Sequence, residues 1–342
     1  MKIAFSERHQ AHGGAQELNF NRMVPMWEKP ERMDAILKEL ARRRFGTLVE
    51  PESFGLEPIH RIHDPAYVGF LMRAYDLWQE QVGIGKFANA TMFAMRGMKQ
   101  VPGSSVQAML SAYTFDVCVP FVGGTWDAMR SAVDCALTAQ ALVQRGERAA
   151  FALCRPPGHH SSQDLAGGYC YLNNAAIAAQ AFLDQGAGRV AILDVDYHHG
   201  NGTQRIFYAR SDVLYLSIHG RPEEEFPYVM GFADETGTAE GEGFNLNLPL
   251  PKGTAWPTFA RALALALNEI DRYRPEVVVL SLGVDAYRGD PVGGFALESD
   301  DFTEIGRMIA TIDCPVLFVM EGGYAVDALG RNVVNLLEGF ES

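Results

Sequence analysis

The chain has 342 residues, of which 48% are hydrophobic and 21% are charged, and its formal net charge is −13. This composition is typical of a folded globular protein and excludes an intrinsically disordered chain. The acidic balance argues against nucleic acid as a partner, because phosphate binding needs a basic face, whereas it is compatible with a cationic substrate.

Short apolar segments alternate with longer helical patterns along the chain. The predicted strands are rich in Val, Ile, Leu and Phe and span residues 2–5, 149–154, 189–194, 213–218, 276–282 and 315–320. The predicted helices span residues 125–145, with Thr125 as a candidate N-cap, and then 173–185, 254–273, 300–312 and 325–337. Their alternation from about residue 125 onwards predicts a doubly wound α/β fold with a mostly parallel sheet flanked by helices.

Residues 79–124 interrupt this pattern. The segment has many glycines and methionines, few clear periods, and chain breakers such as Pro102, Gly103 and Pro120. A connection of this length without secondary structure of its own is usually functional or forms an interaction loop. We therefore expect an insertion with a role of its own.

The cysteines and the apolar runs indicate the compartment. Five widely spaced cysteines without a C-x-x-C motif favour reduced thiols over a disulfide framework. No uncharged apolar stretch reaches the roughly 18 residues of a membrane span, and the N-terminus lacks a signal-peptide pattern. We therefore expect a cytoplasmic protein that does not interact with a membrane.

The strongest chemical signal is the segment DVDYHHGNG, which directly follows the predicted strand 189–194. In an extended chain, alternate residues point the same way, so Asp194, Asp196 and His198 would share one face at the carboxyl end of that strand. Ligands bind at this end of open α/β sheets, and two carboxylates with an imidazole can hold zinc or another divalent ion. The alternative is a helix N-terminus with capping aspartates and incidental histidines.

A second motif, RPPGHH, follows the predicted strand 149–154. Two prolines and a glycine fix a rigid turn just before His159 and His160. Histidine is the side chain most often used for proton transfer near neutral pH. The alternative is a loop that carries a pair of surface histidines.

Two further motifs, SLGVD and MEGGY, also end predicted strands. They place Asp285 and Tyr324 at strand ends, and the paired glycines Gly322 and Gly323 allow the backbone to approach a ligand closely and aim the tyrosine. Either residue alone would be read as structural. Because all four motifs end strands of one predicted sheet, we expect them to converge at one edge.

Together these motifs predict a hydrolase of an acyl bond. A metal with three protein ligands keeps a coordination position for water, lowers the pKa of that water and polarises a carbonyl. Adjacent histidines can move the protons of attack and departure. A tyrosine hydroxyl opposite the metal can stabilise the tetrahedral oxyanion.

The motifs RPPGHH, GGYCYLNNAA, ILDVDYHHGNGTQ, LSIHG, SLGVDA and MEGGY occur in this order. With them, the chain resembles the histone deacetylase superfamily over nearly its whole length, and within it the bacterial acetylpolyamine amidohydrolases. The resemblance implies one arginase/deacetylase-type α/β domain over residues 1–342. It also implies a metal-dependent amidohydrolase that acts on linear amides and releases acetate and a free amine.

The resemblance implies a metal site and a pair of proton carriers. Asp196, His198 and Asp285 match the zinc ligands, with Fe²⁺ as an alternative to zinc. His159 and His160 match the tandem catalytic histidines, and His160 is the expected main general base and acid.

The resemblance also implies supporting roles. Asp194 matches the carboxylate that orients His159, and Asn201 stands where a partner of the second histidine is expected. Many relatives have Asp at this position, which implies a different tuning of that histidine's charge. Tyr324 matches the oxyanion donor, and Tyr169 and Phe226 match the aromatic walls of the acyl tunnel.

Structural potassium is expected from the same resemblance. The ligands of the first ion would be the side chains of Asp194 and Ser217 and backbone oxygens of Asp196, His198 and Ile218. A second alkali-ion site would use backbone carbonyls around Phe207, Arg210 and Val213.

Two features favour the polyamine branch. Residues 79–124 resemble the loop that builds a homodimer and narrows the mouth of the active site in those enzymes. Glu17 stands where that branch has an acidic residue near the mouth, which would attract the distant ammonium of a small cationic acetylated amine. The alternative for Glu17 is a solvated surface acid.

Other features leave the substrate open. The stretch Gly103-Ser104-Ser105-Val106 stands where acidic residues for amine recognition are expected, and residues 288–295 are richer in glycine than the branch pattern. A deacetylase of acetyl-lysine in proteins is therefore the first alternative. A catalytically inactive member that only binds acylated ligands is the second, although neither a zinc ligand nor the tyrosine is lost.

Overall fold

A computed structural model of the chain describes residues 1–19, 22–94 and 102–342. Within these residues a parallel sheet of eight strands forms the centre of the molecule, in the order β4-β1-β5-β10-β9-β6-β7-β8. The strands are β1 (Lys2–Ala4), β4 (Thr47–Val49), β5 (Ala149–Ala152), β6 (Val190–Asp194), β7 (Val213–Gly220), β8 (Asn245–Leu250), β9 (Val277–Leu282) and β10 (Val316–Met320). The predicted α/β class, with one domain built on a parallel sheet, is confirmed.

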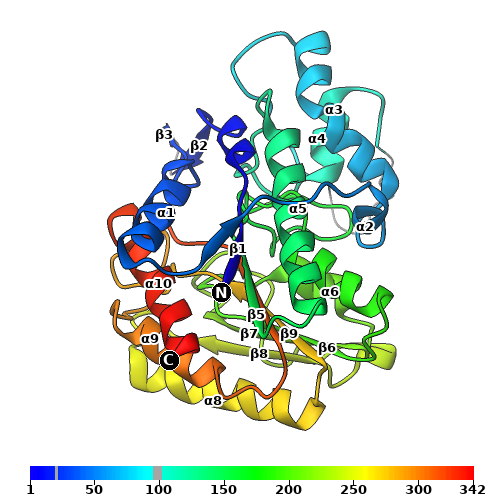
Figure 1. Ribbon diagram of the computed structural model, residues 1–342. Coiled ribbons are helices and arrows are strands. Elements are labelled where there is room, and N and C mark those ends of the chain that lie inside the picture. The colour runs from blue at the N-terminus through cyan, green and yellow to red at the C-terminus, as the bar shows by residue number, and fades with distance from the viewer. Residues whose placement is uncertain (20–21, 95–101) are drawn as a thin grey trace.

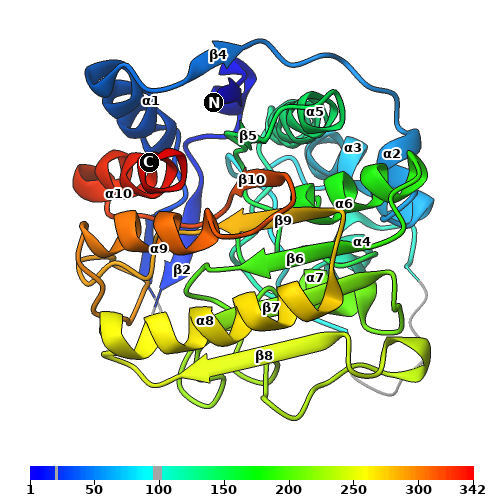
Figure 2. The ribbon, with the colours of Figure 1, turned by 60° about the horizontal axis from the view of Figure 1, so that its bottom comes forward.

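Helices cover both faces of the sheet. One layer contains α3 (Pro65–Gln81), α4 (Val106–Tyr113), α5 (Thr125–Gln144) and α6 (Asn174–Asp184). The other contains α1 (Glu31–Arg43), α8 (Trp256–Tyr273), α9 (Asp301–Ile309) and α10 (Val326–Glu341). Figures 1 and 2 show the two layers on opposite sides of the strands.

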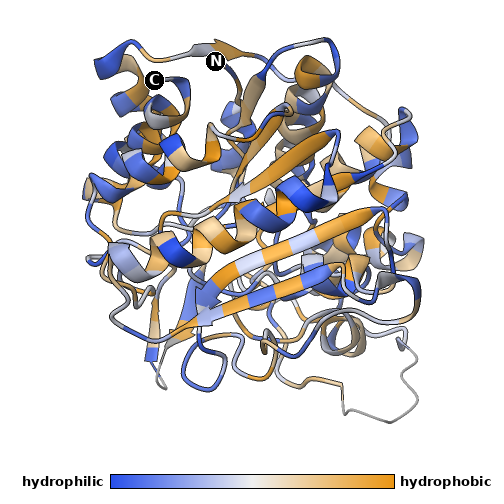
Figure 3. Ribbon diagram, turned by 90° about the horizontal axis from the view of Figure 1, so that it is seen from below, coloured by the Kyte–Doolittle hydropathy of each residue, from blue (hydrophilic) through white to orange (hydrophobic). Residues whose placement is uncertain are grey.

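The burial of β5 explains why the sheet has two apolar faces. Side chains alternate along a strand, so Ala150 and Ala152 pack under α5 and α6 while Phe151 packs on the opposite layer. Strands covered on both faces are apolar throughout, and Figure 3 shows apolar residues concentrated along the central strands.

Smaller elements complete the chain. They are the hairpin of β2 (Gln16–Asn19) and β3 (Arg22–Pro25), the short helices α2 (Glu57–His60) and α7 (Asn201–Phe207), and the 3₁₀ turns η1 (Glu7–Ala11) and η2 (Ala239–Gly241). Among the described helices, none combines the length and the apolar character needed to cross a membrane.

Two expectations about local structure are wrong. Thr125 does not cap α5: the cap is Gly124, and the Thr125 hydroxyl instead accepts a hydrogen bond from the Val122 amide at 2.8 Å. The insertion is not without secondary structure, because α4 lies within it. Ser105 caps this helix by accepting from the Ala108 amide at 3.2 Å, and Val106 is buried in the core.

The topology places the four motif-bearing strands side by side. β5, β10, β9 and β6 are neighbours in the sheet, and all are parallel. Their carboxyl ends therefore meet at one edge, as expected from the sequence, and the loops that follow them build the site.

Candidate active site

Three potential metal ligands meet at the carboxyl ends of β6 and β9. The ligand atoms of Asp196, His198 and Asp285 all lie within 4.8 Å of one another. The imidazole Nδ1 of His198 is 3.3 Å from Asp196 Oδ1 and 3.0 Å from Asp285 Oδ2. Both carboxylates are fully buried. Two carboxylates and one imidazole suit a divalent cation, so the residues present fit the expected metal.

The electrostatics of this cluster favour a bound positive charge. Burial opposes the charged form of His198, but its hydrogen bonds with Asp196 and Asp285 outweigh this and hold its pKa well above the usual range. Burial, together with the neighbouring Asp196 charge, raises the pKa of Asp285 to about 7. A metal cation would supply the charge that the two carboxylates require.

The prediction from strand alternation that Asp194 shares a face with Asp196 and His198 is wrong. β6 ends at this residue, and the chain then turns, so Asp194 does not join the metal cluster. Its Oδ2 instead lies 3.0 Å from His159 Nδ1 and accepts the Tyr215 hydroxyl at 3.1 Å. The pairing of Asp194 with His159 is the arrangement that the family resemblance implies.

The tandem histidines differ in their partners. His159 faces the carboxylate of Asp194, whereas Nδ1 of His160 lies 2.7 Å from Oδ1 of Asn201, the first residue of α7. Their ring centroids are 4.0 Å apart, and both side chains are buried. The rings therefore share one pocket while only one of them has an anionic partner.

The surroundings of the two rings shift their pKa values in opposite directions. Burial disfavours the cation of His159, but Asp196 and Asp194 outweigh it and raise its pKa to about 10. Burial and the positive neighbours His159 and His198 hold the pKa of His160 well below its usual range. These shifts favour the protonated form of His159 and the neutral form of His160.

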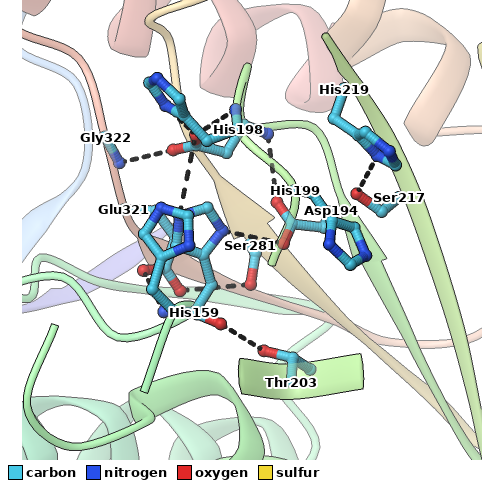
Figure 4. A network of polar contacts seen from close by, with 12 residues as sticks. His159, Asp194, His198, His199, Thr203, Ser217, His219, Ser281, Glu321 and Gly322 are labelled. Atoms are coloured by element: carbon cyan, nitrogen blue, oxygen red, sulfur yellow. Dashed lines mark hydrogen bonds and ion pairs between the residues drawn. The ribbon is translucent and has the colours of Figure 1, made fainter. Parts of the chain in front are cut away.

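The turn that carries the histidines is anchored by Glu321, a contact that the sequence analysis missed. Its Oε2 accepts the amides of Gly158 and His159 at 2.7 and 3.1 Å, and Figure 4 shows Glu321 beside His159. A Cβ on Gly158 would lie 2.5 Å from the Asn174 amide, so only glycine fits there.

A second cluster of metal-ligand type, formed by His159, Cys170 and Glu321, is already satisfied within the protein. The carboxylate of Glu321 accepts two amides, and the Cys170 thiol donates to the Gly168 carbonyl. Burial raises the pKa of this thiol well above its usual range, which disfavours the thiolate that would bind a metal.

The glycine pair before Tyr324 lies against the metal cluster. The Gly322 amide donates to Asp196 Oδ2 at 2.8 Å, and a Cβ on Gly322 would lie 2.5 Å from carboxylate oxygens of Asp196 and Asp285. Gly323 has a φ of 125°, which favours glycine. Gly322 therefore lets the backbone pass close to the metal cluster, and the expected approach of this segment to a ligand stays a prediction.

Aromatic side chains line the approach to the histidines. The Phe226 ring is perpendicular to that of His160 with centroids 5.0 Å apart, and the Tyr169 ring lies 5.5 Å from that of Tyr324. The Tyr169 hydroxyl donates to Glu17 Oε2 at 2.6 Å. Glu17 lies on β2 and is 3% exposed, so it is not a solvated surface acid.

A cavity of about 1200 Å³ opens beside this aromatic wall. Phe226 and Asn201 line it together with Phe93, Phe115 and Asp116 of the insertion. Part of the insertion therefore lies next to the site. Residues 95–101 of the insertion are outside the described residues.

The residues expected to hold potassium are close in the fold. Asp194 and Ser217 are register partners on β6 and β7, and the Ser217 hydroxyl lies 2.8 Å from His219 Nδ1, as Figure 4 shows. Asp196, His198 and Ile218 lie in the adjoining segments. For the second site, the Arg210 amide donates to the Phe207 carbonyl at 2.9 Å, just before β7 begins at Val213.

Comparisons with known proteins agree with this geometry. Residues 26–340 match the family model of the histone deacetylase domain. The chain is 48% identical over its full length to acetylpolyamine amidohydrolase 1 of Pseudomonas aeruginosa, of which it covers 99%. It is 42% identical to the acetylpolyamine amidohydrolase of Mycoplana ramosa, with 99% of both chains covered. A crystal structure of acetylpolyamine aminohydrolase from Burkholderia pseudomallei superposes with a TM-score of 0.95 and 40% identity, over 100% of this chain and 99% of that one.

Proposed function

Because this chain belongs to the histone deacetylase family, we propose that it hydrolyses the acetyl amide of small acetylated polyamines to acetate and free amine. The observation that carries the proposal is the meeting of Asp196, His198 and Asp285 with two tandem histidines and Tyr324 at one edge of the sheet. The similar proteins described above are named acetylpolyamine amidohydrolases, which supports this substrate class.

The metal would be held by Asp196, His198 and Asp285. Zinc is our first choice, and Fe²⁺ is the alternative because metal availability in the cell decides occupancy. When bound, such an ion acts as a Lewis acid toward the acetyl carbonyl and lowers the pKa of water.

His160 is the proposed general base and acid. Its depressed pKa keeps it unprotonated near pH 7, and Asn201 fixes its ring through Nδ1, which leaves Nε2 to take the proton of the attacking water. The same nitrogen then protonates the departing amine. His159 remains a cation beside Asp194 and assists by its charge.

Tyr324 is the proposed oxyanion donor. Burial raises the pKa of its hydroxyl well above the usual range, so the group keeps its proton and can donate a hydrogen bond. The acetyl group would lie between Tyr169 and Phe226, whose rings exclude water from the reacting atoms.

The substrate's second amine would be read at the mouth. Glu17 offers a carboxylate held by Tyr169, and a cationic chain leaving the tunnel would pass it. We further propose that residues 79–124 form a homodimer that narrows this mouth, that potassium occupies the two sites beside β6 and β7, and that the enzyme works in the cytoplasm.

A deacetylation panel tests the proposal. Purified enzyme is assayed with acetylputrescine, acetylcadaverine, acetylspermidine, acetylspermine and an acetyl-lysine peptide, and its metal is identified by elemental analysis. We expect the highest kcat/KM for an acetylpolyamine. A preference for the peptide over every acetylpolyamine would replace our proposal by protein deacetylation.

A further inference from the structure

Asp290 connects the two loops that carry Asp285 and Tyr324. It lies in the loop after β9, is 8% exposed, and reaches across to the loop after β10. Its Oδ2 accepts the amide of Tyr324 at 2.6 Å and that of Ala325 at 3.0 Å. No expectation from the sequence assigns it a role.

The other oxygen of this carboxylate faces the metal side. Oδ1 of Asp290 accepts the Val292 amide at 3.1 Å, and the Val292 carbonyl lies 3.2 Å from Nε2 of His198. A metal-binding histidine is oriented by the group that its other nitrogen contacts. One carboxylate therefore holds the backbone of Tyr324 with one oxygen and, with the other, the peptide segment that contacts His198.

The backbone before Tyr324 cannot orient this residue by itself. Gly322 and Gly323 have no Cβ, and the φ of 125° at Gly323 lies in a region that glycine enters freely. Contacts from outside the segment must therefore fix the direction of the tyrosine. Arg32 donates to the carbonyls of Glu321 and Gly323, whereas Asp290 bonds the amide of Tyr324 itself.

We propose that Asp290 is a positioning residue that aims the Tyr324 hydroxyl at the substrate carbonyl, an inference that rests on the proposed oxyanion role of Tyr324. A carboxylate is the suitable side chain because both oxygens only accept hydrogen bonds. An amide at this position offers one accepting oxygen, so it can serve either Tyr324 or Val292 but not both.

The competing role is purely structural. α10 begins at Val326 and has no side-chain cap, so Asp290 could serve only to cap it through the Ala325 amide. A cap alone would affect thermal stability without any specific coupling to the catalytic contribution of Tyr324. The two roles therefore differ in a measurable coupling.

The test is a double-mutant cycle of Asp290→Asn and Tyr324→Phe, measured on any acetyl amide that the wild-type holoenzyme hydrolyses. Tyr324→Phe should lose on the order of 10²–10³-fold in kcat. Asp290→Asn should lose about 10- to 100-fold in kcat, because a misplacement of about 1 Å can cost 10²-fold. Its KM should change little, and elemental analysis should find the metal retained.

The double variant decides the inference. If Asp290 acts through Tyr324, adding Asp290→Asn to Tyr324→Phe should lower kcat by no more than about twofold further. Losses that multiply, or wild-type kcat in both Asp290→Asn and Asp290→Ala, would overturn it. Near-wild-type turnover of Tyr324→Phe alone would instead refute the oxyanion role and the inference together.

A matched control separates the general effects of losing a capping carboxylate from a specific effect on Tyr324. Asp64 caps α3 by accepting the Ala66 and Tyr67 amides at 2.7 and 3.3 Å. Asp64→Ala removes both of these bonds and should lower the thermal midpoint without changing kcat. If Asp290→Asn does not fold, Asp290→Glu keeps the charge and displaces the oxygens by one methylene, and it is put through the same cycle.

Discussion

The Nδ1 atom of His160 lies 2.7 Å from the amide oxygen of Asn201, so this buried histidine has a neutral partner. Its neighbour His159 has the carboxylate of Asp194 at 3.0 Å instead. The accepting amide oxygen selects the tautomer with hydrogen on Nδ1 and leaves Nε2 as the free base. Replacing one amide by a carboxylate would therefore change the charge of the proposed general base.

Asn201→Asp should raise the pKa of His160. A carboxylate in hydrogen-bond contact stabilises the imidazolium by roughly 1–3 pKa units. The base must be unprotonated to act. As the pH is lowered, the variant should therefore lose activity at a higher pH than the wild type does. The acidic limb of the pH profile of kcat/KM should therefore move upward by roughly 1–3 units.

Asn268→Asp is the control for this shift, because it adds the same charge on the exposed side of α8. Its profile should coincide with that of the wild type. An unchanged acidic limb in Asn201→Asp would mean that His160 is not the group whose protonation limits the reaction.

The sequence predicted those parts of the site that local patterns encode. Asp196, His159 and Tyr324 follow apolar strands directly, and parallel strands bring their ends together. The prediction that Asp194 and His198 share one face was wrong because β6 ends at Asp194. The contacts of Glu321 with the histidine turn and of Asp290 with Tyr324 join loops that are distant in sequence, and no periodicity reports them.

For the fold, too, only the elements with a clear local pattern were predicted. The central strands were predicted because burial on both faces makes them continuous apolar runs, whereas the edge strand β8 alternates as Asn-Leu-Asn-Leu and was missed. The edge strand β4, with only three residues, was missed as well. α1 was not predicted, although its Arg32 contacts the carbonyls beside Tyr324.

Asp285→Ala should release most of the metal. Removing one of three ligands leaves a carboxylate and an imidazole, too few for a stable site. Elemental analysis after dialysis measures the metal content, and circular dichroism checks that the fold is kept. Asp271→Ala, an exposed acid on α8, should keep the wild-type metal content. Full metal retention in Asp285→Ala would contradict the assignment of the site.

The proposed dimer should appear in sedimentation velocity at micromolar concentration. Ile84 and Met92 of the insertion are 69% and 71% exposed, more than any other large apolar side chain in the described part of the chain. Met92→Glu should shift the population toward monomer, whereas Leu265→Glu, 56% exposed on α8, should leave it unchanged. A monomeric wild type would remove both the dimer and the narrowed mouth.

Glu17→Gln should separate charged from uncharged substrates. Glutamine still offers an oxygen to the Tyr169 hydroxyl, so the tunnel wall keeps its partner while the charge is lost. An exposed carboxylate–ammonium pair contributes about 0–1 kcal/mol, and a pair shielded from water contributes a few. For an acetylpolyamine, kcat/KM should therefore fall by a factor of a few up to about 100.

The contrast between two substrates carries this test. An uncharged acetamide with the same tunnel-filling chain should be hydrolysed by Glu17→Gln nearly as well as by the wild type, because it has no ammonium to lose contact with. Burial raises the pKa of Glu17, so the difference should shrink as the pH falls and this carboxylate becomes protonated. A folding defect would lower both substrates alike. If both fall equally, or neither changes, Glu17 does not recognise the amine.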